Sequence, residues 1–110
     1  MSKFRLWASL AMLAFAGSAS AQVGPTYASG HITNVTFTSG SVMIMLDVGL
    51  PSNCVGSAYG WMTIPGDYKL MAAFVMGLWL RGDASQTVVT VYADGLVNGY
   101  CRLSQIDPAN

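Results

Sequence analysis

Residues 61–92, WMTIPGDYKLMAAFVMGLWLRGDASQTVVTVY, decide the fold of this 110-residue chain. A short run of apolar and β-branched residues, Trp61–Ile64, predicts a strand that ends at a Pro-Gly turn. Apolar residues at helical spacing then predict a helix over Tyr68–Arg81. The β-branched run Gln86–Ala93 predicts the next strand. The stretch therefore indicates a strand, a helix and a strand in that order.

The predicted helix has a defined beginning and end. Asp67 stands where an N-cap carboxylate would accept hydrogen bonds from the first turn. Gly82 is the expected C-terminal stop, because glycine adopts the left-handed conformation at low cost. Arg81 lies in the last turn, where a cation is favourable near the negative end of the helix dipole. Lys69 is the only other charged residue, so the helix has almost no polar face.

Two apolar stripes run along this helix. At 3.6 residues per turn, one stripe has the spacing of a core-facing surface and contains Tyr68, Met71, Ala72, Val75, Leu78 and Trp79. The opposite side of a surface helix is normally polar, but here it contains Leu70, Ala73, Phe74, Met76, Gly77 and Leu80. This second stripe needs an apolar partner.

Three partners are open for the second stripe. Another copy of the protein is favoured, because the small residues Ala73 and Gly77 would let neighbouring helices approach closely. A loop or the N-terminal segment of the same chain would cover the stripe equally well. A bilayer is the third partner, although about 13 residues cannot span a hydrocarbon core that needs about 20. We therefore predict an oligomer interface at the second stripe and no stable membrane span.

The remaining strands complete a mainly β framework. Gly30–Phe37 is a first strand whose apolar positions change phase once, which predicts a bulge near Thr33 and Asn34. Ser41–Val48 alternates regularly and predicts a hairpin with the first strand, and Tyr100–Ile106 predicts the last strand. The order β-β-β-α-β-β fits an OB-fold, a five-stranded partly open Greek-key barrel. A separate α+β sheet with one packed helix has the same order of elements.

The N-terminus has the pattern of an export signal. Lys3 and Arg5 precede the apolar run Leu6–Ala16, and small residues follow. This order of basic, apolar and small residues predicts a signal peptide over residues 1–21, cleaved near Ala21. A membrane anchor is the alternative, but the run is short for a hydrocarbon core. We therefore expect a periplasmic or secreted bacterial protein.

Cleavage would leave about 90 residues, enough for one small domain. We expect a flexible N-terminal segment over residues 22–29 and the OB-fold domain over residues 30–110. Both cysteines, Cys54 and Cys101, belong to that domain, and an exported protein with one pair is expected to oxidise it to a disulfide. Free or metal-binding thiols are the alternative, although no CxxC spacing or nearby histidine supplies further ligands.

Composition excludes several function classes. The chain has five Lys and Arg residues in total, and they do not cluster, which argues against a nucleic-acid partner. His31 is the only histidine, and the sequence contains no metal-ligand cluster, no nucleophile beside a base and no phosphate-binding loop. Glutamate is absent and the aspartates are scattered. We therefore predict no enzyme, no cofactor and no metal site.

Aromatic residues offer a second kind of binding surface. The faces of Tyr59, Trp61, Tyr92 and Tyr100 would stack on sugar rings if these side chains were exposed. Packing in the core or at the mouth of the barrel is the alternative use of the same residues. The sequence does not assign a ligand-binding residue.

The strand order, the 61–92 stretch and a late Gly-Tyr-Cys-Arg-Leu segment resemble the B subunits of AB5 toxins of the subtilase cytotoxin, typhoid and pertussis type. The resemblance covers nearly all of the chain after the signal peptide and rests on the pattern and on Trp61, Gly82 and Cys101. The chain is also similar to short exported bacterial proteins with one disulfide. The toxin family implies an OB-fold, a pentameric ring with its helices around a central pore, and binding of sialylated glycans. Toxin pore helices carry several polar residues, whereas the second stripe here is apolar.

Together these observations predict an exported non-catalytic binding module that forms a ring, of five subunits by the resemblance, and recognises a glycan or another extracellular partner. The alternative is a structural or envelope-associated oligomer without a small-molecule ligand. A third, weaker hypothesis is membrane perturbation through exposed helices. Exposed aromatic residues in a cluster would favour the first hypothesis, because sugars stack on such surfaces.

Overall fold

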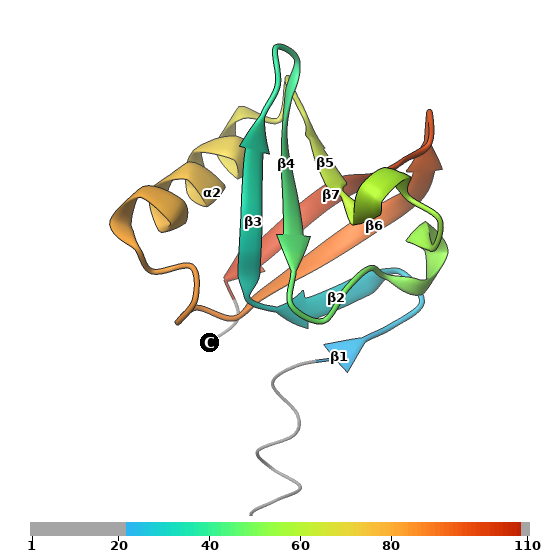
Figure 1. Ribbon diagram of the computed structural model, residues 1–110, viewed down its shortest axis with the longest axis horizontal. Helices are drawn as coiled ribbons and strands as arrows, with labels where there is room; N and C mark the ends of the chain where they lie inside the picture. Colours follow the sequence, from blue (N-terminus) through green and yellow to red (C-terminus); the bar gives the residue numbers. More distant parts are fainter. Residues whose placement is uncertain (1–21, 109–110) are drawn as a thin grey trace, which may run out of the picture.

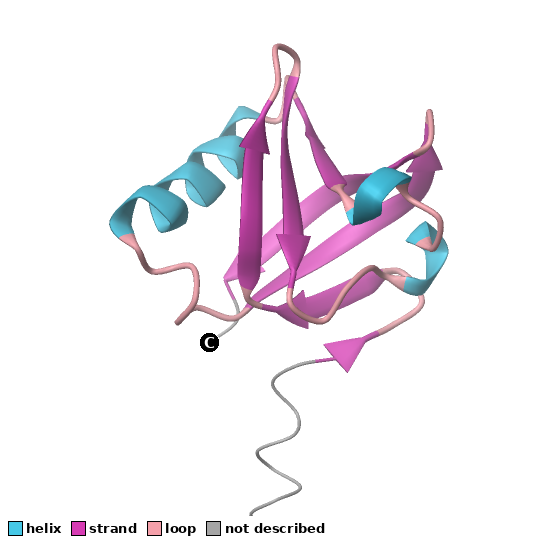
Figure 2. Ribbon diagram, in the orientation of Figure 1, coloured by secondary structure: helices cyan, strands magenta, loops and turns pink. Residues whose placement is uncertain are grey.

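The computed structural model describes residues 22–108, so the predicted signal peptide and its cleavage site near Ala21 lie outside the described residues. One mixed sheet and one α-helix, α2 (Lys69–Arg81), form the domain (Figures 1 and 2). The strands are β1 (Gln22–Val23), β2 (Tyr27–Gly30), β3 (Ile32–Phe37), β4 (Ser41–Leu46), β5 (Met62–Pro65), β6 (Val89–Val97) and β7 (Tyr100–Pro108). Two short 3-10 helices, η2 (Ser52–Cys54) and η3 (Ala58–Gly60), lie between β4 and β5.

The seven strands follow the order β1-β2-β6-β7-β5-β4-β3. The β5–β7 pair is parallel, and the other pairs are antiparallel. Figure 1 shows β3, β4 and β5 in front of the long β6–β7 ribbon, which crosses behind them, with α2 on the flank beside β3. The sheet is therefore strongly curved, and its concave side encloses the core. It is not closed by pairing, because β1 and β3 are its two edges among the described residues.

The strand count differs from the five expected. The predicted first strand, Gly30–Phe37, corresponds to β3, which pairs with β4, whereas β1 and β2 precede it, and β2 pairs with β6. Residues 22–29, expected as a flexible segment, contain β1 and most of β2, because Gln22 pairs with Ser29 and Ala28 pairs with Val91. The second of these pairings joins residues far apart in the sequence. Local composition, which is rich in Gly, Ser and Thr there, therefore did not reveal them.

The hairpin of β3 and β4 confirms the sequence prediction. Its register shifts between Ile32 and Asn34, which is the predicted position of the bulge. In β4, Val42, Ile44 and Leu46 are buried, as their alternation indicated. The bulge lets the strand bend without turning its apolar residues away from the core.

Strand β6 extends farther than predicted. Asp94 and Gly95, expected in a turn, continue the strand, and the turn lies at Asn98 and Gly99. Both turn residues have positive φ angles, 54° and 85°. Register shifts around Ala93 and Gly95 accommodate the extra residues as bulges in the β6–β7 ladder.

The ends of α2 agree only in part with the prediction. Tyr68, not Asp67, is the N-cap, and its side chain makes no capping bond. The Tyr68 amide donates to the carbonyl of Pro65 in the preceding turn. Gly82 ends the helix as expected with a φ of 78°, and its amide donates to the carbonyl of Trp79. Arg81 occupies the last turn.

The core contains apolar residues from every part of the sheet except β1, together with one residue of α2. Val75 is fully buried, whereas Trp79 is 39% exposed although its spacing predicted the core. Phe74, assigned to the outer stripe, instead packs against the core from its edge. The largest fully buried side chains are Ile44, Met62, Ile64, Leu103, Val75, Val89, Val91 and Pro51.

The predicted disulfide is confirmed. Cys54 in η2 and Cys101 in β7 are bonded, with Cα atoms 5.1 Å apart across 47 positions of sequence. Both residues are fully buried. Ser57 supports the same contact, because its hydroxyl accepts the amide of Cys101 at 2.9 Å and donates to the carbonyl of Trp61 at 2.5 Å. The crosslink and this hydrogen bond hold the β4–β5 connection on the sheet.

Replacing both cysteines with serine should lower the free energy of unfolding by roughly 2 to 4 kcal/mol, because the crosslink restricts a long loop in the unfolded chain. Urea unfolding followed by circular dichroism, with and without reductant, measures the change. The wild-type protein should lose the same amount on reduction, and the double variant should not respond to reductant. Equal stability of oxidised and reduced wild type would contradict this role.

Candidate functional site

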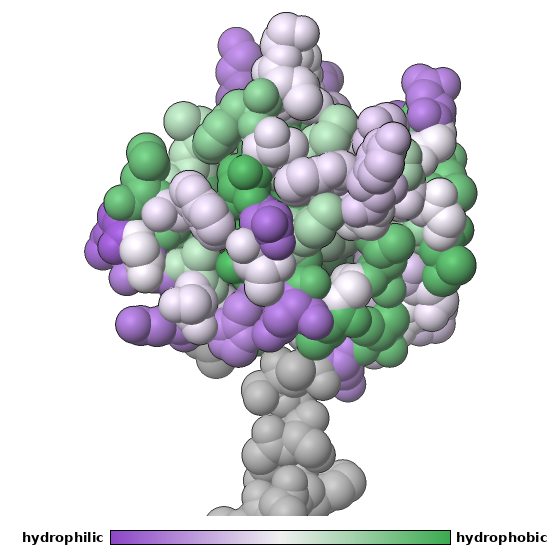
Figure 3. Space-filling model, in the orientation of Figure 1, coloured by the Kyte–Doolittle hydropathy of each residue, from purple (hydrophilic) through white to green (hydrophobic). Residues whose placement is uncertain are grey.

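The second stripe of α2 is largely exposed. Leu70 and Leu80 are 89% and 76% exposed, and Ala73 and Met76 are also on the surface. A side chain added at Gly77 would meet no atom within 4 Å. In the space-filling view, hydrophobic side chains lie on the part of the surface that α2 forms (Figure 3). Within residues 22–108, no loop covers this stripe.

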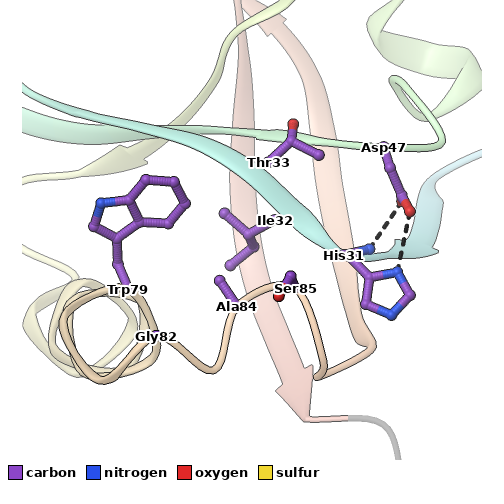
Figure 4. Close-up of a pocket in the computed structure, with 8 residues that line it drawn as sticks. All are labelled: His31, Ile32, Thr33, Asp47, Trp79, Gly82, Ala84 and Ser85. Atoms are coloured by element: carbon purple, nitrogen blue, oxygen red, sulfur yellow. Dashed lines mark hydrogen bonds and ion pairs between the residues drawn. The ribbon is translucent and has the colours of Figure 1, made fainter.

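A cleft of about 590 Å³ opens where β3 meets the C-terminal end of α2. We call it the bend cleft, because it lies beside the break between β2 and β3. Figure 4 shows side chains from β3, from the end of β4, from α2 and from the loop after α2 facing one another across it. Its lining residues are His31, Ile32, Thr33, Asp47, Trp79, Gly82, Ala84 and Ser85.

Asp47 and His31 form the polar end of the bend cleft. The Asp47 Oδ1 atom accepts the backbone amide of His31 at 2.9 Å, and its Oδ2 atom lies 3.0 Å from His31 Nδ1. The backbone amide of Asp47 donates to the carbonyl of His31, also at 2.9 Å. Asp47 therefore binds both backbone polar groups of the residue at which the strand bends.

The pKa of Asp47 lies below its ordinary value. Partial burial of the carboxyl group raises the pKa, but hydrogen bonds from the His31 backbone and side chain, the charge of His31 and a hydrogen bond from the Val48 backbone lower it by more. These interactions favour the ionised form. The rim of the cleft consequently carries a carboxylate at neutral pH.

Gly30 makes the approach of Asp47 possible. A Cβ atom on residue 30 would overlap the Oδ1 atom of Asp47 and would touch the Val48 side chain. Gly30 is buried, and the Asp47 oxygen that the Cβ atom would meet is held in place by the His31 amide. A glycine is therefore required by close packing at the bend, although its backbone conformation does not require one.

A second concavity, of about 360 Å³, lies on the outer face of the sheet between the β3–β4 turn and the β6–β7 turn. Met43, Thr63 and Arg102 are neighbours across β4, β5 and β7 there. Arg102 Nη2 lies 3.0 Å from Asp94 Oδ2, so its charge is already paired. This concavity is smaller than the bend cleft.

The four aromatic residues that the sequence suggested for sugar stacking do not form one cluster. Tyr59 is 86% exposed in η3, and Tyr100 lines the second concavity. Tyr92 packs against Tyr27 with ring centroids 6.3 Å apart, and Trp61 is partly buried after η3. The aromatic wall of the bend cleft is instead Trp79, which helical spacing had assigned to the core.

The sequence did not indicate the pair of His31 and Asp47. The signal was present in the predicted hairpin, because pairing Ile32 with Leu46 places the preceding and following residues side by side. Asp47 belongs to the predicted strand Ser41–Val48, but residue types alone do not indicate that it contacts His31. The pair is visible only once the register of the hairpin is known.

The described residues contain no group of three or more His, Cys, Asp and Glu side chains that could hold a metal ion. No helix within residues 22–108 is long and apolar enough to cross a membrane. Comparison with protein-family models, curated proteins and solved structures finds no match for this chain.

Replacing Gly30 with alanine should destabilise the protein by about 1 to 3 kcal/mol, the usual range for overpacking at a closely packed position. The added Cβ displaces Asp47 from the bend. Urea unfolding measures the loss, and Gly40→Ala is the matched control, because a Cβ atom there meets nothing within 4 Å. A Gly30→Ala protein as stable as the control would refute close packing at the bend.

Replacing Asp47 with asparagine should destabilise the protein at neutral pH but not in acid. Because its folded-state pKa is lowered, ionised Asp47 stabilises the fold above the unfolded-state pKa of about 4. That contribution disappears as the pH falls through the folded-state pKa.

Urea unfolding of both proteins across this pH range, with the exposed Asp67→Asn variant as control, tests the dependence. The stability difference between wild type and Asp47→Asn should narrow as the pH falls below about 4, where the carboxylate becomes protonated. A difference that is independent of pH would show that Asp47 acts only as a hydrogen-bond acceptor.

Proposed function

We propose that this protein is an exported, non-catalytic binding module that assembles into a ring through the second stripe of α2 and recognises a glycan. The single observation that carries the proposal is the exposure of this stripe. A chain with 9% charged residues leaves a row of large apolar side chains in water. Contiguous exposed apolar surface in a small domain is typical of an interaction site.

The strand order supports an OB-type barrel. β2 and β3 are separated only by His31, yet they lie near opposite ends of the sheet order. Suppose that β3 and β2 are the two halves of one bent first strand. The sheet order β3, β4, β5, β7, β6, β2 then reads as first, second, third, fifth, fourth and again first strand. The helix then lies between the third and fourth strands. This is the partly open Greek-key arrangement expected from the sequence.

The composition of the stripe favours a second copy as its partner. Ala73 and Gly77 lie between Leu70 and Leu80, so neighbouring helices can approach closely along the middle of the stripe while the leucines pack at its ends. Phe74 contributes to the core and would support this surface from below rather than form it. A ring of subunits, five in the toxin resemblance, would bury the stripe of every copy.

The surface recesses provide room for a ligand. OB-type barrels bind oligosaccharides and oligonucleotides on the face of their middle strands and the adjoining loops, which here correspond to the second concavity. Neither the second concavity nor the bend cleft contains the row of unpaired basic side chains that nucleic acid requires. A hydroxyl-rich ligand therefore fits this surface better than a polyanion.

The buried disulfide supports an oxidising compartment, either the periplasm or the exterior. The alternative function is a structural or envelope-associated oligomer without a small-molecule ligand. Dispersal of Tyr59, Tyr92 and Tyr100 over different surfaces favours that alternative. A glycan array separates the two functions, since a purely structural oligomer would bind no sugar on it.

Replacing Leu80 with glutamate should dissociate the oligomer without unfolding the subunit, because the side chain is 76% exposed and its charge would be buried between copies. Light scattering during size-exclusion chromatography measures the mass. The matched control is Val55→Glu, which places the same charge at a residue that is 73% exposed outside α2.

The wild type and Val55→Glu should have the mass of an oligomer, and Leu80→Glu should have the mass of a monomer with an unchanged circular dichroism spectrum. A monomeric wild-type protein, or an unchanged mass of Leu80→Glu, would refute the interface.

A further inference from the structure

We propose that the bend cleft binds an uncharged pyranose ring, either a neutral hexose or an N-acetylhexosamine. The inference rests on the proposed recognition of glycans and adds to it the place, the chemical class and the contacting residues. It is independent of ring assembly, because every lining residue belongs to one chain.

The apolar wall of the cleft matches one face of a sugar ring. Trp79 projects into the cleft from α2, and 39% of its surface is exposed (Figure 4). Ile32 and Ala84 are almost fully buried and form the floor beside it. An indole that is supported from below but open at one face is suited to stack on the C–H groups of a pyranose, because the aromatic face is apolar and electron-rich.

The polar rim matches the hydroxyl groups of the same ring. Each carboxylate oxygen of Asp47 accepts one interaction from His31, and an ionised carboxylate has about four acceptor positions in total. The Val48 backbone occupies a third position, so about one acceptor position remains for a sugar hydroxyl. His31 uses Nδ1 for Asp47, which leaves Nε2 for a ligand, and Ser85 supplies an exposed hydroxyl.

The charge of the cleft selects an uncharged sugar. Asp47 is the only Asp, Glu, Lys or Arg among its lining residues. Arg81 is the cation nearest in sequence to the cleft residue Gly82, and its Nε atom pairs with Asp83 at 3.4 Å. The carboxylate of an acidic sugar would therefore meet Asp47 without a compensating cation. This selectivity differs from the sialylated glycans that the toxin resemblance implies.

The size of the cleft agrees with this class. A volume of about 590 Å³ is within the range of small-molecule sites, about 300 to 1,000 Å³. The indole and the carboxylate stand at opposite ends of the cleft with the apolar floor between them (Figure 4). The cleft therefore offers a sugar an apolar stacking face at one end and a carboxylate acceptor for its hydroxyls at the other.

NMR titration of the oxidised, ¹⁵N-labelled protein tests the proposal. The probes are methyl β-galactopyranoside, methyl α-glucopyranoside, N-acetylglucosamine and, as the acidic comparison, N-acetylneuraminic acid. At least one neutral probe should shift the Trp79 indole N–H signal and the amide of Ser85. Trp79→Ala and Asp47→Asn should each weaken binding about tenfold or more, as expected for loss of a stacking face or of a charged acceptor.

Control variants separate this inference from the proposed function. Tyr100→Ala, in the second concavity, should leave the affinity unchanged, and so should Leu80→Glu in the helix stripe. Asp47→Asn and the milder Trp79→Phe keep the test valid if Trp79→Ala does not fold. If the protein binds sugars on an array but Trp79 and Asp47 variants bind equally well, the bend-cleft inference fails and glycan recognition stands.

Three further results would overturn the inference. The first is no shift with any neutral probe at millimolar concentration. The second is preferential binding of N-acetylneuraminic acid. The third is a shift of the Trp79 indole signal on raising the protein concentration without sugar, since a second copy would then occupy the cleft. If no neutral probe shifts a signal and no sugar on the glycan array binds, both glycan recognition and the bend-cleft inference are refuted.

Discussion

The curved sheet depends on the hydrogen bonds between Asp47 and His31, which we call the clamp. The carboxylate of Asp47 accepts the amide of His31, and the amide of Asp47 donates to the carbonyl of His31. At this residue the chain leaves its pairing with β6 and begins its pairing with β4. Without an internal partner, the polar backbone groups at the bend would have to be satisfied by water at the edge of the core. The clamp therefore lets one segment of chain serve two parts of the sheet, and Gly30 provides the space for it.

The helix α2 imposes a second constraint, because its outer side leaves apolar side chains exposed to solvent. Val75 is fully buried and Phe74 packs at the edge of the core, so α2 is held on the sheet by its inner side. The outer side carries Leu70 and Leu80, which the fold of the single chain does not bury. Burial of apolar surface contributes about 25 cal/mol per Å², so such a stripe favours association far more than an ordinary polar helix face would. The stability of the domain and its capacity to assemble therefore reside on different sides of the same helix.

The bend cleft is a consequence of these two features. The clamp fixes His31 and Asp47 at one side of the cleft, and the helix carries Trp79 to the other (Figure 4). Gly82 ends the helix in the left-handed conformation and turns the chain back toward the core, which it rejoins at the buried residue Ala84. A change at the bend or at the helix end would thus alter both the fold and the shape of the cleft. The groups of the proposed site are held by backbone structure on both sides, which reduces the cost of ordering them on binding.

The sequence by itself determined the features that depend on neighbouring residues or on a unique choice: the alternation of β4, the bulge after Ile32, the extent of α2 and the single disulfide of Cys54 and Cys101. Only the tertiary structure decided the addition of β1 and β2 before the first predicted strand, the length of β6, the exchange of Phe74 and Trp79 between core and surface, and the contact of His31 with Asp47. Helical periodicity places a residue within a broad arc, and residues at the edge of that arc are buried or exposed according to what the sheet places beside them. Strand pairing likewise joins residues that are distant in sequence, so a segment rich in glycine and serine becomes a strand when a partner with free hydrogen-bonding groups lies next to it.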